Sequence, residues 1–323
     1  MRKEDLKIVF MGTPEFAVES LRILVENNYN IAGVITMPDK PSGRGHKVQY
    51  SAVKEYALAN NLPLLQPEKL KDETFIESLK AWQADLQIVV AFRMLPEIVW
   101  GMPPSGTFNL HASLLPQYRG AAPINWAIIN GEKETGATTF FLTHEIDTGK
   151  IIKQIHFPIL ETDNAGIVHD KLMQSGAQLV KETVDLIIEN KVDAVLQEQL
   201  IPAGSKLKAA PKIFKETCRI NWLQSVATIY NFIRGLAPYP AAWTELSQPG
   251  TEALSIKIYS SEKVAEKHQL TAGQIRTDNK TFLEVACEDG FIRILEIQFP
   301  GKRKMKTDEL LRGFKFNENS LFK

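Results

Sequence analysis

The stretch TFNLHASLLPQYRG, residues 107–120, decides both the fold and the chemistry that this sequence predicts. A short strand-like run over 106–110 ends at the polar pair Asn109 and His111. Because side chains alternate between the two faces of a strand, this pair lies on one face. Pro116 prevents simple continuation of the strand, and Gly120 allows backbone conformations that other residues avoid. An amide that can hold a developing oxyanion, beside an imidazole that can carry a proton near neutral pH, indicates acyl-type chemistry.

Strand-like and helical runs alternate on both sides of this stretch. The strand-like runs cover 7–11, 31–37, 86–92, 137–142 and 151–159, and helical spacing covers 15–28 and 164–189. Such alternation predicts an α/β fold with a mostly parallel sheet that is covered on both faces. Ligands of such sheets bind at the carboxyl ends of the strands, which is where Asn109 and His111 fall.

The pattern changes near residue 200. Proline and glycine residues in 201–212 indicate a linker. Beyond it, one helix is expected over 224–236, followed by short strands over 242–246, 254–259, 282–287 and 291–298. Short strands separated by turn residues predict a small antiparallel barrel. We therefore expect a catalytic domain over 1–200, a linker over 201–212 and a second domain over 213–323.

Charge is distributed unevenly along the 323 residues. The net charge is zero, but the part from Lys208 onward has 18 Lys and Arg against 13 Asp and Glu, a net charge of +5, and the remainder carries −5. A polyanion that contacts mainly the C-terminal part would explain this difference, and chance unevenness of solvated surface is the alternative. The hydrophobic content of 44% is enough for a sizeable core.

The two cysteines, Cys218 and Cys287, have neither a paired spacing nor the spacing of metal ligands. Reduced thiols in the cytosol are therefore expected. The chain does not open with a charged and then apolar leader, and no apolar run reaches the length of a membrane span. These features predict a cytoplasmic protein.

Several motifs resemble those of a known family. Asn109-Leu110-His111, then Ser113-Leu-Leu-Pro116 and YRGAAPI over 118–124, resemble the signature of the folate-dependent formyltransferases. Asp147-Thr-Gly149 follows at the offset of that family's catalytic aspartate. The patterns GTPEFAVESL (12–21) and TMPDKPSGRGHK (36–47) are similar to those members that act on methionyl-tRNA. The resemblance covers nearly the whole chain and implies a Rossmann-like first domain and an OB-fold-like second domain.

This resemblance implies an activity and three catalytic residues. The formyl group of 10-formyltetrahydrofolate, a co-substrate, would pass to the α-amino group of methionine on initiator tRNA, without a metal ion. Asn109 would donate to the oxyanion, His111 would manage the proton, and Asp147 would orient His111 and be available to relay the amine proton. Each has a structural alternative, namely a strand-end amide, a packed histidine and a turn-forming aspartate. A contribution of His144 stays open, and we expect it to be structural.

Two sets of binding residues follow from the same resemblance. The folate is expected to dock against Ser113, Leu114, Leu115 and Pro116, and against a segment that holds Phe92 and Arg93. That segment is one residue shorter than the family's pattern and has Arg93 where glycine is expected. The tRNA is expected to contact Lys40, Arg44 and Lys47 in a long loop, and Lys302, Arg303, Lys304 and Lys306 in a basic run. A solvated surface is the alternative for both basic segments.

Other functions remain to be separated from this one. A dinucleotide site after the first strand is rejected, because Gly12 stands alone where the fingerprint needs three glycines. The alternatives are formylation of a small amine, hydrolysis of formyl-folate, and tRNA binding without catalysis. The two basic segments argue against a small amine, and the set of Asn109, His111 and Asp147 argues against a non-catalytic protein. A monomer is expected, because a tRNA must reach both domains.

Overall fold

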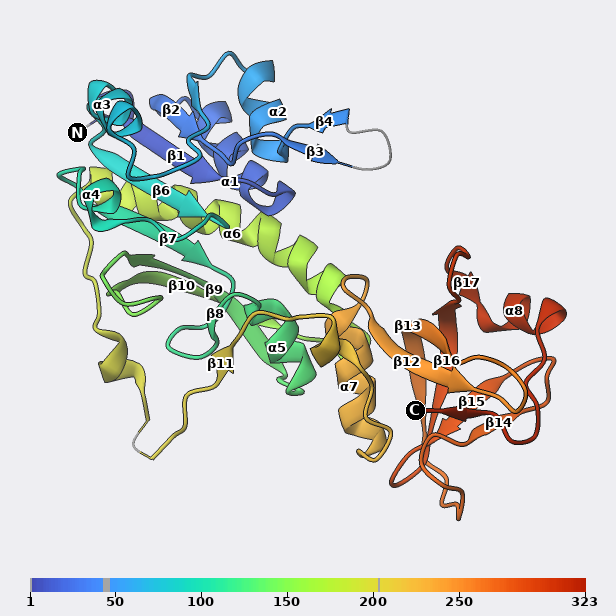
Figure 1. The fold of residues 1–323 in the computed structure, drawn as a ribbon. Coiled ribbons are helices and arrows are strands. Elements are labelled where there is room, and N and C mark those ends of the chain that lie inside the picture. Colours follow the sequence, from blue (N-terminus) through green and yellow to red (C-terminus); the bar gives the residue numbers. More distant parts are fainter. Residues whose placement is uncertain (1, 43–46, 203) are drawn as a thin grey trace. The chain divides into compact units, whose positions relative to one another are not determined.

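The computed structural model describes residues 2–42, 47–202 and 204–323, of which 40–42 and 47–48 by their backbone alone (Figure 1). Contacts divide the chain into two compact units. Unit 1 comprises residues 1–120, 135–157 and 169–209, and unit 2 comprises 121–134, 158–168 and 210–323. Within the described residues, no helix is both long and apolar enough to span a membrane.

A seven-stranded sheet forms the centre of unit 1, in the order β10-β9-β7-β6-β1-β2-β5. The pairs β1–β2, β1–β6, β2–β5 and β6–β7 are parallel, and β9 is antiparallel to β7. This confirms the expected mostly parallel sheet. The strands are β1 (Ile8–Gly12), β2 (Ile31–Ile35), β5 (Leu64–Leu65), β6 (Leu86–Val90), β7 (Thr107–His111), β9 (Glu134–Phe141) and β10 (Ile151–Pro158).

Helices and short elements complete the first two thirds of the chain. The helices are α1 (Glu15–Glu26), α2 (Ala52–Ala59), α3 (Glu73–Ala81), α4 (Glu97–Trp100), α5 (Pro123–Ile129) and α6 (Ala165–Ile188). The side chains of Ser51 and Asp72 accept backbone hydrogen bonds at the starts of α2 and α3, which satisfies N–H groups that the helix itself leaves free. The short elements are β3 (Lys40–Ser42), β4 (Lys47–Gln49), β8 (Arg119–Gly120), η1 (Gln197–Leu200) and β11 (Ala209–Ala210).

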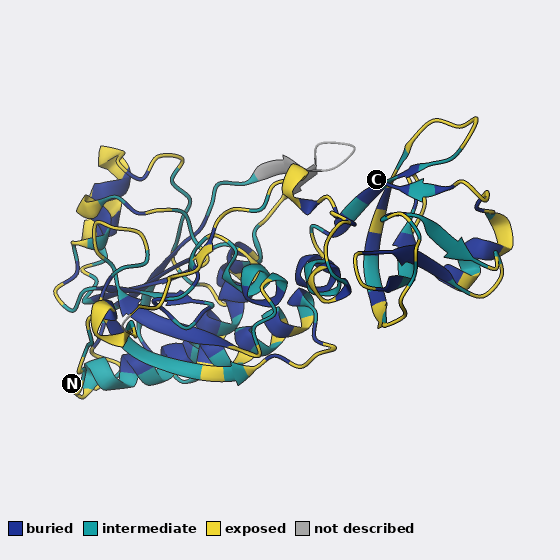
Figure 2. Ribbon diagram, turned by 90° about the horizontal axis from the view of Figure 1, so that it is seen from below, coloured by how far each residue is buried: buried dark blue, intermediate teal, exposed yellow. Residues whose placement is uncertain are grey.

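The two faces of the sheet have different partners. On one face, Val9 and Val89 belong to a buried cluster that includes residues of α3 and α4. On the other, a Cβ atom on Gly176 of α6 would lie 3.0 Å from Cδ2 of Leu110. Side chains alternate along β7, so the neighbours of Leu110 point to the face that α3 and α4 cover. Figure 2 shows the central strands buried between these layers.

Unit 2 is built around an antiparallel barrel with the strand order β14-β15-β16-β13-β12-β18, to which β17 adds beside β16. A bridge between Gln274 and Leu321 joins the two end strands, so the barrel is nearly closed. Closure requires glycine at position 273, where φ is +85° and a Cβ atom would lie 2.1 Å from the carbonyl oxygen of Phe322. The expected small barrel is confirmed.

The elements of this barrel and its attached helices occupy residues 216–322. They are η2 (Glu216–Cys218), α7 (Val226–Leu236), β12 (Ala242–Ser247), β13 (Leu254–Val264), β14 (Ile275–Thr277), β15 (Leu283–Ala286), β16 (Phe291–Gln298), β17 (Met305–Lys306), α8 (Thr307–Gly313) and β18 (Leu321–Phe322).

Candidate active site

Asn109 lies on β7, on the face away from α6, with Val89 and Phe140 as its neighbours across the sheet. The strand continues to His111, one residue beyond the predicted end. Asn109 is partly exposed, and its side-chain amide forms no hydrogen bond with any residue that the structure describes. An amide that is positioned by a sheet but has no protein partner is available to a ligand.

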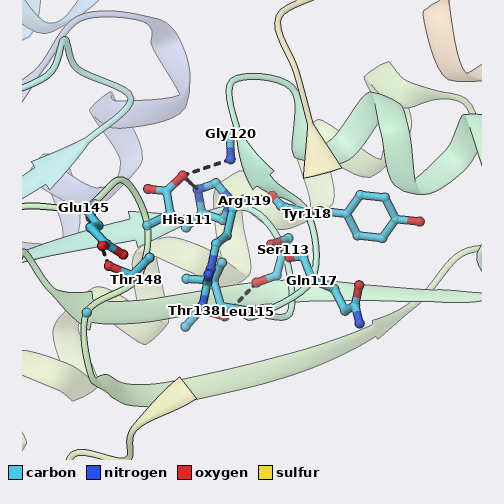
Figure 3. A network of polar contacts seen from close by, with 12 residues as sticks. His111, Ser113, Leu115, Gln117, Tyr118, Arg119, Gly120, Thr138, Glu145 and Thr148 are labelled. Atoms are coloured by element: carbon cyan, nitrogen blue, oxygen red, sulfur yellow. Dashed lines mark hydrogen bonds and ion pairs between the residues drawn. The ribbon is translucent and has the colours of Figure 1, made fainter. Parts of the chain in front are cut away.

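The ring of His111 is buried, and each of its nitrogens faces an oxygen atom of the protein (Figure 3). Its Nε2 lies 2.9 Å from the carbonyl oxygen of Tyr118. A carbonyl oxygen can only accept, so Nε2 carries the hydrogen of this bond. In the neutral ring Nδ1 is then the basic nitrogen, and it lies 3.9 Å from Oδ2 of Asp147. The atom that can take up a proton therefore faces a carboxylate.

Asp147 reaches this position from the loop 142–150, between β9 and β10. Because β9 is antiparallel to β7, the loop begins at the amino end of β7, where the N–H of Leu142 donates to the carbonyl of Thr107 at 2.8 Å. His111 lies four residues along the strand, about 13 Å away at a rise of about 3.3 Å per residue. The loop must therefore extend back along β7. At its tip Asp147 has φ of +56°, and its Oδ2 accepts a hydrogen bond from the N–H of Gly120 at 2.9 Å.

Gln197 fixes the loop that carries Asp147. Its side chain is fully buried, and its Nε2 donates to the carbonyls of Asp147 and Gly149, at 2.9 Å in each case. Its Oε1 accepts from Nε and Nη2 of Arg119, at 3.0 and 2.6 Å. Sequence reasoning missed this residue, since a single glutamine fifty positions after the aspartate carries no recognisable signal.

Gly149 is required for the same loop. A Cβ atom at this position would lie 1.6 Å from the carbonyl oxygen of Phe141, far inside van der Waals contact. No side chain fits between the loop and β9. The glycine of the Asp147-Thr-Gly149 motif therefore has a steric role in bringing the aspartate to the histidine.

The turn after β7 is held by polar contacts to β9 and β10. The hydroxyl of Ser113 donates to the carbonyl of Gln117 at 2.7 Å, and Oγ1 of Thr138 donates to the carbonyl of Ser113 at 2.6 Å. Leu115 is buried, and its carbonyl accepts from Nε2 of Gln154 at 2.8 Å. These contacts make Ser113 and Leu115 supports of the turn. A folate contact of Ser113, Leu114, Leu115 or Pro116 stays a prediction.

Arg93 is turned toward backbone carbonyls. Its guanidinium donates to the carbonyl of Glu68 at 2.8 Å and to that of Pro67. Burial lowers the pKa of Arg93 below its ordinary value. Phe92 packs against the cluster under α3 and α4. Arg93 thus ties its segment to 67–68, and the folate role of both residues stays a prediction.

His144 lies outside the Asp147–His111 contact. Its ring packs edge-on against Trp100 with centroids 5.3 Å apart, and its Nε2 lies 3.3 Å from Oε1 of Glu97. Both contacts are with residues of α4. Among the described residues, no three His, Cys, Asp or Glu side chains lie together as metal ligands would.

The four basic residues of the run 302–306 that were predicted to contact tRNA are exposed in unit 2, and two of them are paired. Arg303 forms an ion pair with Glu309, and Lys304 lies 3.0 Å from Glu296. Lys302 and Lys306 have no ion pair to any described residue. Of the loop residues, Arg44 lies outside the described residues, and only the backbone of Lys40 and Lys47 is described.

The sequence matches two family models. One is described as formyl transferase and covers residues 6–184, and the other is described as formyl transferase, C-terminal domain, and covers residues 212–315. The chain is 66% identical to methionyl-tRNA formyltransferase of Bacteroides fragilis over 318 residues. These residues make up 98% of this chain and 98% of the relative. It is 53% identical over 317 residues to methionyl-tRNA formyltransferase of Flavobacterium johnsoniae, 98% of this chain and 99% of the relative.

Solved structures share the fold. A sugar 3N-formyl transferase, WlaRD, crystallised in the presence of dTDP and 5-N-formyl-THF, matches with a TM-score of 0.62 at 21% identity, over 92% of this chain and 99% of its own. An N-formyltransferase of Helicobacter canadensis matches with a TM-score of 0.62 at 23% identity, over 90% and 98%. With family models that cover most of its length and relatives of such high identity, the chain belongs to the formyl transferase family.

Proposed function

We propose that this enzyme transfers the formyl group of 10-formyltetrahydrofolate to the α-amino group of methionyl-initiator-tRNA, giving formylmethionyl-tRNA for translation initiation. The observation that carries the proposal is the free amide of Asn109 beside His111, whose Nδ1 faces Asp147. This arrangement stands in a chain that is 66% identical to a methionyl-tRNA formyltransferase.

Each group has a distinct task in the proposed reaction. The amine nitrogen attacks the formyl carbon, a C–N bond forms, and the carbonyl oxygen becomes an oxyanion. The NH₂ group of Asn109 donates to that oxygen more strongly as its charge develops. The attacking amine loses a proton to Nδ1 of His111, and the carboxylate of Asp147 stabilises the imidazolium. The bond to N10 of the folate then breaks, and the proton returns to this leaving nitrogen.

The tetrahedral intermediate needs a rigid site, and the loop contacts supply it. Asp147 is held by Gly120 through its carboxylate and by Gln197 through its backbone. His111 cannot rotate without losing its bond to the carbonyl of Tyr118. A pre-oriented donor and base lower the barrier because little reorganisation is needed when charge develops.

The substrate side of the proposal rests on charge. Lys302 and Lys306 are exposed and unpaired among the described residues, as phosphate contacts require, while Arg303 and Lys304 would have to exchange a carboxylate for a phosphate. Contacts of Lys40, Arg44 and Lys47 with the acceptor end of the tRNA remain part of the proposal. We place the enzyme in the cytoplasm, as a monomer.

One assay tests the function. The purified protein is incubated with 10-formyltetrahydrofolate and, in separate reactions, Met-tRNA, an amino-sugar nucleotide or water alone. We expect formyl-methionine on the tRNA as the main product. Formylation of the amino sugar, or release of formate without an acceptor, would overturn the proposal in favour of one of the alternative functions.

Matched histidine variants make the assay specific to the site. His111→Asn should abolish most of the transfer, whereas His144→Asn should retain it, because the ring and ion-pair contacts of His144 with described residues are to Trp100 and Glu97 of α4. Retained transfer in His111→Asn would show that His111 is not the base, and an equal loss in both variants would show that the effect is not specific to His111.

A further inference from the structure

A pocket of about 470 Å³ lies in unit 2, and none of its lining residues belongs to the candidate active site. Its walls come from the start of α5, from residues 212–218, from the turn 239–241 and from the outer faces of β12 and β13. A volume of this size is in the range of ordinary small-ligand sites. All of its lining residues belong to one unit.

The charge of the pocket is one-sided. Lys212, Lys215 and Lys257 line it, and no Asp or Glu is among the fourteen residues of its wall. All three lysines are exposed, and none has an ion pair with a described residue. Lysines without carboxylate partners around a concave surface favour an anionic ligand.

The pocket also presents aromatic rings to solvent. Phe214 is 55% exposed and Tyr239 is 83% exposed. Trp243 is partly exposed, and its indole N–H donates to the carbonyl of Lys215 at 2.7 Å, which fixes the segment 212–218 against β12. In the β12–β13 register Trp243 lies opposite Lys257, so an aromatic and a basic residue leave the outer face of the barrel at neighbouring positions, and the Arg219 guanidinium lies 5.3 Å from the centroid of the Trp243 ring.

Rings and cations in one pocket match the chemistry of an unpaired nucleotide. Unstacked bases bind by stacking on aromatic side chains, while the adjoining phosphates bind lysine or arginine. We infer that this pocket binds one unpaired nucleotide of the tRNA substrate. Its base would lie against Phe214 and Tyr239, and its phosphate near Lys257 and Lys212. The inference rests on the proposed function, because that function brings an RNA to the protein.

The test is a nucleotide-resolution footprint of Met-tRNA on the full chain, without the formyl donor. Wild-type protein should protect at least one unpaired nucleotide that becomes reactive again with the double variant Phe214→Leu, Tyr239→Leu, while the rest of the footprint persists. The dissociation constant should rise about 5-fold to 100-fold, the range of one lost stacking contact. Leu223→Ala is the control, since Leu223 is 73% exposed in the same unit and does not line the pocket.

A second pair of variants tests the phosphate contact independently of base stacking. Lys257→Gln should weaken binding and flatten its salt dependence, while Lys267→Gln, an exposed lysine outside the pocket, should leave both close to wild type. Circular dichroism checks that each variant is folded.

Three results would overturn the inference. One is a footprint that is the same in wild type and in the folded double variant. The second is an unchanged dissociation constant in that variant. In the third, free adenosine or uridine monophosphate binds and its binding is lost in the Phe214 and Tyr239 variant, but the tRNA footprint of that variant is unchanged. The pocket would then be a site for a free mononucleotide. Formyl transfer by wild type, measured in parallel, distinguishes these results from failure of the proposed function, in which no Met-tRNA is formylated.

Discussion

The candidate active site and the basic run 302–306 use polar residues in opposite ways. At the site, His111 and Gln197 are buried, His111 is bonded to a backbone carbonyl and faces Asp147, and Gln197 is bonded to two backbone carbonyls and to Arg119. In the basic run, Arg303 and Lys304 are exposed and paired with acids on the surface. If both regions act as proposed, the position of each group matters at the site, whereas the charge of each residue matters in the run. Changes at the site should therefore be large and indifferent to salt, and changes in the run small and dependent on salt.

The largest effect is expected from the catalytic residues. Asn109→Ala and His111→Ala should each lower turnover by a factor on the order of 10²–10⁴, because in the proposed mechanism both groups act mainly in the transition state. Asp147→Asn should cost a comparable factor. Single-turnover kinetics at saturating Met-tRNA measures the effect. Near wild-type turnover of the His111 variant would show that the proton passes through another group.

The next effect is on folding. Gly149→Ala places a Cβ atom against the carbonyl oxygen of Phe141, so we expect a loss of about 3 kcal/mol in the free energy of unfolding, or failure to fold. Gly313→Ala is the matched control, because a Cβ atom there would have no neighbour within 4 Å. Urea unfolding followed by tryptophan fluorescence gives both values. Equal stability of the two variants would mean that the loop 142–150 shifts freely.

A smaller effect should follow from Gln197→Glu. This change keeps the shape and the acceptor for Arg119 but removes the donor to the carbonyls of Asp147 and Gly149. Misplacing Asp147 should lower kcat by up to about 100-fold, with little change in KM for tRNA. Gln199→Glu, on the exposed side of η1, is the control. A loss that appears in KM alone would assign Gln197 to substrate binding.

The smallest effect concerns salt. Lys302→Gln with Lys306→Gln should flatten the slope of log affinity against log salt by up to about 1.8, at about 0.9 for each phosphate contact. Arg303→Gln with Lys304→Gln should flatten it less, because Glu309 and Glu296 already oppose a phosphate there. Tritium-labelled or fluorescent Met-tRNA binding at several salt concentrations measures the slopes. If neither pair changes its slope, the run is solvated surface.

The sequence predicts the site where its signal is local. Asn109 and His111 are two residues apart on a strand, and period-two alternation is enough to place them on one face. Asp147 was expected from the resemblance, with a turn-forming aspartate as the alternative. The two interpretations are compatible, because Asp147 has φ of +56° at the tip of the loop and its carboxylate also faces His111. Most of the predicted strands and helices are present with small errors at their ends, but β13 runs five residues beyond its predicted end at 259, and β14, β17, β18 and α8 were not predicted.

The rest of the site depends on contacts between distant residues. Gln197 donates to backbone carbonyls, which every residue has. The sequence therefore contains no particular residue type that would show which groups Gln197 contacts. The N–H of Gly120 binds Asp147 in the same way. The acids that pair with Arg303 and Lys304 lie six and eight positions away, and their geometry depends on the barrel. Single-sequence reasoning therefore proposes candidates for the reacting groups more readily than it identifies the residues that hold them.

The bond from Gln197 to the loop of Asp147 also has a consequence for the order of folding. The strand that carries His111 is complete by residue 111, but the aspartate is clamped only when a segment some fifty residues beyond it has docked. Closing a loop of some fifty residues costs more entropy and is slower than the pairing of β6 with β7, whose partners Gln87 and Thr107 are twenty residues apart. During refolding, protection of the Gly120 amide against hydrogen exchange should therefore appear later than protection of β6 and β7. Catalytic activity should appear at the same rate as protection of the Gly120 amide. A chain in which the sheet has formed but this amide is still unprotected should be inactive.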